Sequence, residues 1–179
     1  MREISLHIMD IAENGIAAGA KRIEINVEEN RRDNLLKVEI CDNGCGIPPE
    51  MLANITDPFV TGRTTRRVGM GLSLLKAAAE RCAGTFDIAS EPGKGTRTAA
   101  TFQYDHIDRA PLGDMVGTVM LLIAGRPETD FLYTHIINGK DFVLDTAEIK
   151  AELGDISIAD PTVIRQLKQS VKEIIDSCQ

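Results

Sequence analysis

The stretch that decides the fold is residues 3–27, EISLHIMDIAENGIAAGAKRIEINV, where one repeat of apolar residues gives way to another. Residues 3–18 repeat isoleucine and alanine every three or four positions, so they are predicted to form an amphipathic helix. Residues 22–27 alternate apolar and polar side chains, which predicts a strand with one buried face. A helix followed at once by a strand indicates a layered α/β fold.

The same two patterns predict the rest of the chain. The further elements are strands at 36–40, 85–89, 96–102, 131–137 and 142–144, and helices at 50–54, 72–82, 146–153 and 161–177. Residues 56–71 are rich in Thr, Gly and Arg and are predicted to form a mobile loop, whereas the apolar residues 112–124 fit a helix or a strand. Helix, two strands, helix and two strands predict a two-layer domain at residues 1–104, followed by a small α+β extension at 105–179.

Composition restricts the function classes. The chain has 179 residues, of which 43% are hydrophobic, and a net charge of −7. Residues 1–104 carry 13 basic and 14 acidic side chains, and residues 105–179 carry 7 and 13, so the extension is the acidic part. We therefore expect no nucleic-acid partner. The longest apolar run is about half of the ~20 residues that span a membrane, and we expect a cytoplasmic protein with four reduced cysteines.

A polar stripe on the first helix is the first of three candidate binding motifs. Asp10 and Asn14 are one helical turn apart and therefore share a face. Mg²⁺ prefers oxygen ligands and keeps several waters, so Asn14 can serve as a neutral ligand beside phosphates. Asp10 can orient or deprotonate a water or hydroxyl aimed at a γ-phosphate. A solvated helix face explains the same stripe without any site.

The second motif follows the strand at 36–40. Asp42 leaves that strand and meets Gly44 and Gly46. A carboxylate accepts a hydrogen bond from the exocyclic amine of adenine, and the glycines allow a close backbone approach to the base. An ordinary tight turn explains this stretch equally well.

The third motif is the turn Gly69–Met70–Gly71–Leu72, which opens the helix at 72–82. A glycine-rich turn at a helix N-terminus presents free N–H groups and a favourable dipole to phosphate. Arg63, Arg66 and Arg67 precede it, and they fit either phosphate contacts or a solvated loop. Taken together, the three motifs predict a pocket for adenine, Mg²⁺ and a triphosphate.

With these motifs the chain resembles the GHKL ATP-binding superfamily of gyrases, heat-shock ATPases, sensor histidine kinases and MutL-type repair proteins. The resemblance covers about residues 3–104 and implies a Bergerat sandwich, a mixed sheet with helices on one face. The stretches from Asp57–Pro58–Phe59 to Gly69–Met70–Gly71–Leu72 and Ser90–Thr96 are most similar to the kinase branch, and Glu13–Ala20 is similar to the MutL branch.

The resemblance also implies roles for individual residues. Asn14 would bind Mg²⁺, Asp42 would hold the adenine amine, Gly44 and Gly46 would shape the adenine pocket, Phe59 would flank the nucleotide, Arg63 would approach the phosphates, the turn Gly69–Met70–Gly71–Leu72 would hinge a lid and bind phosphate, and Thr96 would lie near adenine.

Two departures from the family pattern bear on function. Hydrolytic members usually place Glu where this chain has Asp10, which is shorter by one methylene. Sensor kinases also carry a helical hairpin with a phosphoacceptor His, which these 179 residues lack. We therefore expect a stand-alone phosphotransfer protein acting on a partner protein, with a nucleotide-controlled binding switch or a slow MutL-like ATPase as alternatives. The extension completes the core, forms a homodimer or binds the partner.

Overall fold

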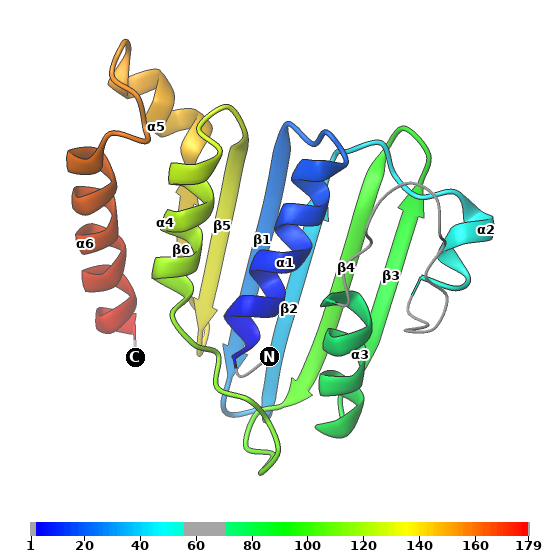
Figure 1. Ribbon diagram of the computed structural model, residues 1–179. Coiled ribbons are helices and arrows are strands. Elements are labelled where there is room, and N and C mark those ends of the chain that lie inside the picture. The colour runs from blue at the N-terminus through cyan, green and yellow to red at the C-terminus, as the bar shows by residue number, and fades with distance from the viewer. Residues whose placement is uncertain (1–2, 56–70, 179) are drawn as a thin grey trace.

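The computed structural model describes residues 3–55 and 71–178 and is built around one mixed sheet of six strands (Figure 1). The strands are β1 (Arg22–Asn30), β2 (Leu35–Asp42), β3 (Phe86–Glu91), β4 (Gly95–Gln103), β5 (Asp130–Ile137) and β6 (Lys140–Asp145). Their order across the sheet is β3-β4-β2-β1-β5-β6. All neighbours are antiparallel except β1 and β5, which run parallel. The predicted α/β class with a mixed, open sheet is confirmed.

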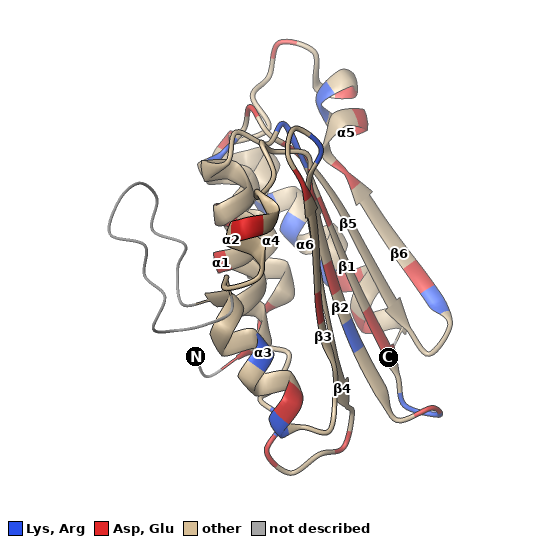
Figure 2. Cartoon of the chain, turned by 90° about the vertical axis from the view of Figure 1, so that its right-hand side faces the viewer, with Lys and Arg blue, Asp and Glu red and all other residues tan. Residues whose placement is uncertain are grey.

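Helices α1, α3 and α4 lie over one face of this sheet (Figures 1 and 2). The helices are α1 (Ile4–Ala17), α2 (Pro49–Leu52), α3 (Gly71–Arg81), α4 (Met115–Gly125), α5 (Thr146–Leu153) and α6 (Pro161–Cys178). The apolar stretch that fitted either a helix or a strand forms α4, which packs between α1 and α6. Among the residues that the structure describes, none of the helices combines the length and the hydrophobicity of a membrane span.

The core lies between α1 and the central strands. Ile23, Ile25 and Val27 of β1 are fully buried, and so are Ile4 and Ile8 of α1. The alternation in β1 places its buried side chains on the helix-covered face, as expected for a strand with one buried side. Since aromatic residues make up only 4% of the chain, branched aliphatic side chains supply most of this packing.

The sheet runs without a break past residue 104, because β5 pairs with β1 along the whole strand. Ile23 lies opposite Phe131, and Val27 lies opposite His135. The connection from β4 to α4 also crosses the start of α1, where the Ile4 and Ser5 amides donate to the carbonyls of Pro111 and Leu112 at 3.0 and 2.8 Å. Residues 105–178 therefore share one core with the described residues before them.

A buried polar network joins β1 to β5 at the end of the sheet remote from Asp42. Glu29 Oε1 lies 2.9 Å from His135 Nε2, and His135 Nδ1 lies 2.8 Å from the Tyr133 hydroxyl. Because the Glu29 carboxylate can only accept, His135 donates from Nε2 and accepts from Tyr133. Tyr104 donates a further bond of 3.1 Å to Glu29. The bond from His135, opposed by burial, lowers the pKa of Glu29.

Replacing Glu29 should expose the contribution of this network. When folding lowers the pKa of a carboxyl group, the ionised group stabilises the folded protein at any pH above the ordinary Glu pKa. That stabilisation is lost as the pH falls through the pKa of the folded state. We expect Glu29→Gln to reduce the free energy of unfolding at pH 7 by about 1–3 kcal/mol, with a smaller difference from wild type near pH 4. Urea denaturation at both pH values measures this.

The matched control is Glu28→Gln, the adjacent residue on the opposite face of β1, which should change stability by less than ~0.5 kcal/mol. Equal losses in the two variants would show that the network adds nothing specific.

Candidate nucleotide site

Asp42 ends β2 on the helix-covered face and is the centre of the candidate site. Its Oδ1 accepts the Gly44 amide at 2.8 Å, and the Thr96 backbone also donates to the carboxylate. Burial raises the pKa of Asp42 above its ordinary value, and these two bonds oppose the rise. The carboxylate is therefore oriented by backbone donors and is partly withdrawn from water.

The loop that follows Asp42 is held on both sides. The Cys45 amide donates to the carbonyl of Ala18 at 3.0 Å, just past the end of α1. The Cys45 carbonyl accepts the Gly93 amide at 2.8 Å from the turn between β3 and β4. On the other side of Asp42's loop, Asn43 Oδ1 accepts the amides of Lys21 and Arg22 at 2.8 and 2.9 Å. These bonds leave the loop little freedom around the carboxylate.

Three glycines permit the backbones around Asp42 to approach one another. A Cβ on Gly15 of α1 would lie 2.8 Å from Asp42 Cβ, so only glycine lets α1 pass this close. A Cβ on Gly46 would overlap the Glu91 carbonyl, and one on Gly95 would overlap the Asp42 carbonyl. Gly46 and Gly95 also have positive φ angles of 67° and 103°, a region that disfavours other residues.

Asp10 and Asn14 lie on the α1 face that meets α3. A Cβ on Gly71, the first residue of α3, would overlap Asp10 Oδ2, so the Gly71 backbone rests against this carboxylate. Asn14 Nδ2 is buried and has no hydrogen-bond partner in the described part of the chain. An unpartnered buried amide is costly, and a ligand that engages the Asn14 side chain would relieve part of that cost.

The predicted site residues are thus partly brought together. Asp10 lies against Gly71, and Asp42 lies against Gly44 and against Gly15 of the same helix α1. Asn14 follows Asp10 by one helical turn. Leu72 is 5% exposed and belongs to the core. The remaining predicted residues, Phe59, Arg63, Gly69 and Met70, lie outside the described residues, as do Arg66 and Arg67.

Thr96 lies directly opposite Asp42 in the pairing of β4 with β2. Its hydroxyl is 2.9 Å from the Ser90 hydroxyl, which donates to the Gly95 carbonyl at 2.8 Å. Ser90 also accepts the Ile47 amide at 2.8 Å. Ser90 therefore ties the β3–β4 turn to the loop after β2, although the sequence assigned it no role.

Ser90, Gly15 and Gly95 are the residues that sequence reasoning left out of the site. Each belongs to a stretch that resembles the family, but no charge or ligand-forming group marked it. Their importance comes from strand register and backbone contact, which residue type alone does not reveal.

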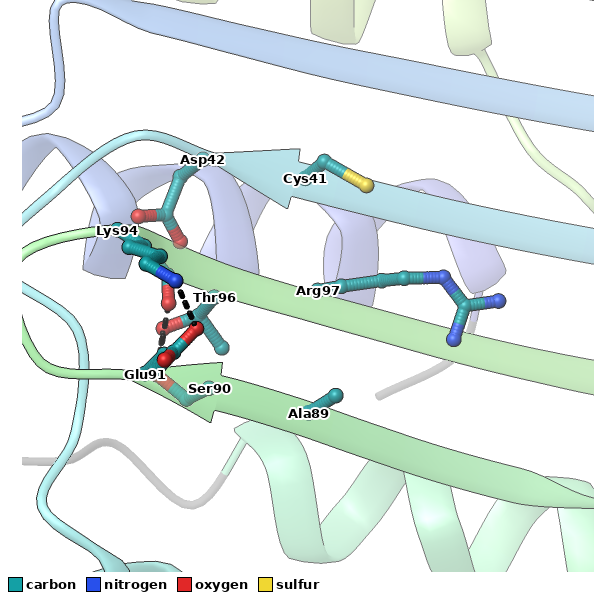
Figure 3. Close-up of a pocket in the computed structure, with 9 residues that line it drawn as sticks. Cys41, Asp42, Ala89, Ser90, Glu91, Lys94, Thr96 and Arg97 are labelled. Atoms are coloured by element: carbon teal, nitrogen blue, oxygen red, sulfur yellow. Dashed lines mark hydrogen bonds and ion pairs between the residues drawn. The ribbon is translucent and has the colours of Figure 1, made fainter.

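A hollow of about 500 Å³ lies at this end of the sheet. Figure 3 draws the residues that line it. Its lining includes Asp42 and Thr96, with Cys41 and Arg97 from the same two strands. The ion pair of 2.8 Å between Glu91 and Lys94 lies at the β3–β4 turn. Arg97 itself is paired with Glu39 and with Asp87 on the sheet face opposite the helices. Cys41 and Ala89 lie directly opposite Arg97 in the strand pairing, so this hollow opens on the face of the sheet away from the helices and is not the space between α1 and α3.

The donor set suits a magnesium ion that keeps part of its water. Within the described residues, no group of three or more His, Cys, Asp or Glu side chains could hold a metal by itself. Asn14 offers a single amide, with Asp10 one turn away on the same helix. Such a sparse set fits Mg²⁺ bound chiefly by phosphate oxygens and water.

Comparison with known proteins identifies the family. Residues 2–106 match the model for histidine kinase-, DNA gyrase B- and HSP90-like ATPases. The chain belongs to this family. Its residues 2–106 are thus an ATP-binding domain of the histidine kinase type, which confirms the predicted GHKL resemblance.

Two curated relatives of this ATP-binding domain are sensor kinases. A probable C4-dicarboxylate sensor kinase of Bacillus subtilis is 37% identical over 82 residues, covering 46% of this chain and 15% of the relative. The Bacillus subtilis sensor histidine kinase YxdK is 36% identical over 90 residues, covering 48% of this chain and 27% of the relative. The chain therefore matches less than a third of each of these longer proteins.

Solved structures share the fold beyond the family domain. The ATPase domain of Aquifex aeolicus MutL, complexed with ADP, has a TM-score of 0.52 at 14% identity and covers 81% of this chain and 63% of that one. The N-terminal domain of a DNA repair protein gives 0.56 at 15% identity, with coverages of 81% and 53%. Residues 2–106 make up less than 81% of the chain. The structural likeness therefore extends past residue 106 into the part of the chain that follows the family domain.

The contact between Gly46 and Glu91 can be tested with two glycine variants. Gly46 and Gly93 both have positive φ, at 67° and 79°, but a Cβ at Gly93 would meet nothing within 4 Å. We expect Gly93→Ala to cost about 1 kcal/mol of stability, from backbone strain alone. Gly46→Ala should cost more and should also weaken nucleotide binding, because the clash displaces the loop after Asp42.

Thermal unfolding and ATP titration of both variants measure the two effects. Equal behaviour of Gly46→Ala and Gly93→Ala would mean that the close approach to Glu91 has no role in the site.

Proposed function

We propose that this protein binds Mg-ATP and transfers its γ-phosphate to a partner protein. The observation that carries the proposal is that α1 meets both ends of the candidate site, with Asp10 against the Gly71 backbone and Gly15 against Asp42. Family membership supplies ATP binding, and the finer assignment rests on these side chains. Acidic side chains dominate residues 105–179, so a protein partner in the cytoplasm fits better than a nucleic acid.

Asp42 is the adenine-binding residue in this proposal. The Gly44 amide donates a hydrogen bond to Asp42 Oδ1, and the carboxylate can still accept a further bond from the exocyclic amine of adenine. Guanine carries a carbonyl at the matching position and would be repelled by the carboxylate. Gly15 and Gly44 keep side chains away from the Asp42 carboxylate.

Asn14 and Asp10 act on the phosphate end. Asn14 would hold Mg²⁺ through its side-chain oxygen, and the bound ion supplies charge neutralisation on the phosphates. Asp10 would accept a proton from the hydroxyl or imidazole of the partner as that group bonds to the γ-phosphorus. The bond from this phosphorus to the β–γ bridging oxygen breaks, and ADP leaves. The Gly71 backbone beside Asp10 places the N-terminus of α3 next to the reacting groups, where its dipole favours negative charge.

A slow ATPase is the second candidate, and one observation favours it. The fold is similar to that of the MutL ATPase domain over 81% of this chain. In that case Asp10 positions a water in place of the partner's nucleophile. A switch that binds ATP without turnover needs Asp42 and Asn14 but makes no use of Asp10.

One labelling experiment separates these functions. The purified protein is incubated with Mg²⁺ and ATP labelled in the γ-phosphate, with and without fractionated extract as a source of partner. Label on another protein supports phosphotransfer, and release as free phosphate supports the ATPase. Retained ATP with neither outcome refutes both enzymatic functions and leaves the switch.

Asp10→Asn should remove the proton acceptor while keeping the shape of the site. We expect turnover to fall by about 10²–10⁴-fold and the dissociation constant for ATP to change by less than ~3-fold. Glu13→Gln, an exposed residue on the same helix, is the control and should leave both unchanged. Normal turnover in Asp10→Asn would exclude Asp10 from the chemistry.

Asp42→Asn should abolish detectable ATP binding, because the amide would present a donor where the adenine amine also donates. Isothermal titration measures the affinity, and circular dichroism checks that the fold is intact. Asp87→Asn, on the opposite face of the sheet, should bind ATP like wild type. Because the pKa of Asp42 is raised, acidification protonates its carboxylate at a higher pH than it would an ordinary Asp. As the pH is lowered, ATP affinity should therefore begin to fall at that higher pH. Wild-type affinity in Asp42→Asn would refute the adenine assignment.

A further inference from the structure

β6 is an edge strand whose outer side pairs with no other strand of the described chain. The order β3-β4-β2-β1-β5-β6 places it at one end of the sheet, next to β5 alone (Figure 2). An edge strand directs backbone N–H and C=O groups away from its sheet, and a strand of another chain can pair with them. The proposed phosphotransfer makes no use of this edge.

The hydrogen bonds of β5 decide which of its residues bond toward β6. The Asp130 amide at the start of β5 donates to the Lys21 carbonyl, and the Asn138 amide just past its end donates to the Glu29 carbonyl, both at 2.8 Å. Both acceptors lie on the β1 side of β5. Since successive residues of a strand direct their backbone groups to opposite sides, the even-numbered residues of β5 bond toward β1 and the odd-numbered residues bond toward β6.

Strand register then identifies the outward groups of β6. The odd-numbered residues of β5 lie opposite Lys140, Phe142 and Leu144, which therefore complete the ladder. Asp141 and Val143 direct their amides and carbonyls away from β5, and these groups have no hydrogen-bond partner within residues 3–55 and 71–178. The backbone of these two residues is named the β6 edge below.

The side chains at the β6 edge are acidic and aliphatic. Asp141 and Val143 lie on the sheet face opposite the helices, because the intervening Phe142 is buried on the helix-covered face. Val143 is 52% exposed. Among the described residues, Asp141 forms no ion pair, whereas Asp145 is paired with Arg22 at 2.9 Å. The edge therefore offers one unpaired carboxylate beside one exposed branched side chain.

A second copy of this chain complements the β6 edge poorly. Antiparallel pairing of two β6 strands about Val143 would place Asp141 of each copy opposite Asp145 of the other. Like charges directly opposite one another destabilise a strand pair. Because Arg22 already pairs with Asp145, this arrangement supplies no cation for Asp141. A strand with a basic side chain beside Asp141 has the complementary charge.

We propose that the β6 edge binds a partner protein by strand addition, and that the added strand carries Lys or Arg beside Asp141 and Val, Ile or Thr beside Val143. Main-chain hydrogen bonds to the outward amides and carbonyls supply affinity, and the neighbouring side chains supply selectivity. Strand addition requires neither ATP nor Asp10, so it goes beyond the proposed phosphotransfer and is tested without nucleotide.

The probe is a fluorescent peptide of about ten residues that repeats Lys-Thr-Val-Thr, titrated by anisotropy in the absence of ATP. Val143→Pro removes an outward amide and leaves the β5–β6 ladder intact, because that amide takes no part in it. We expect the dissociation constant to rise at least about tenfold in Val143→Pro and to stay within ~3-fold of wild type in Val143→Thr. Equal affinity of Val143→Pro and wild type, or no binding by the wild type, would overturn the proposal.

The charge requirement is tested with Asp141→Asn. Asp155→Asn is the matched control, since it removes the same charge from an exposed position between α5 and α6. We expect the dissociation constant for the peptide to rise at least about threefold in Asp141→Asn and to stay unchanged in Asp155→Asn. Equal losses in the two variants would indicate general attraction of a basic peptide to an acidic protein and would overturn the proposal.

Two measurements on the wild type do not depend on any variant folding. The Asp141 and Val143 amides should exchange hydrogen rapidly in the free protein and slowly with the peptide, whereas the Phe142 amide in the ladder should exchange slowly in both. Unchanged exchange at Asp141 and Val143 would overturn the proposal. Sedimentation should show a monomer, and a dimer whose contact protects these same two amides would assign the edge to a second copy and overturn the stated partner.

Discussion

The packing of α1 on the central strands is the interaction on which the rest of the structure depends. Ile4 and Ile8 bury their side chains against the alternating residues of β1, so the rotation of α1 about its own axis is fixed. That rotation turns Asp10 and Asn14 toward α3 and brings Gly15 against Asp42. Burial of one apolar stripe therefore orients the polar stripe that carries the proposed chemistry.

Missing side chains are as important to the site as those present. Gly15, Gly46 and Gly71 each allow a backbone to touch another segment where a methyl group would clash. Because these contacts are close and involve backbone, the spacing between α1, α3 and the strand ends has little tolerance. A site that must grip a phosphate chain at one end and a base at the other benefits from such fixed spacing.

A single strand pairing makes the extension part of the main sheet instead of a separate unit. Parallel pairing of β5 with β1 makes residues after 104 part of the main sheet, and the buried bond between Glu29 and His135 ties the two strands together. The acidic side chains of this part of the chain consequently belong to the same sheet and core as the proposed nucleotide site.

Sequence by itself predicted the helix at residues 3–18, which the structure has at 4–17, and the alternating strands. It also supplied the residue types at positions 10, 14 and 42 on which the proposed phosphate, magnesium and adenine contacts rest. Local periodicity reports burial, and side-chain chemistry is independent of fold, so both are visible before folding. Only the tertiary structure decided that 115–125 is a helix, that β5 joins β1 in parallel, and that Ser90 and Gly95 fix the β3–β4 turn beside Asp42. Those facts depend on strand register and on contacts between segments far apart in the chain, which no local pattern encodes.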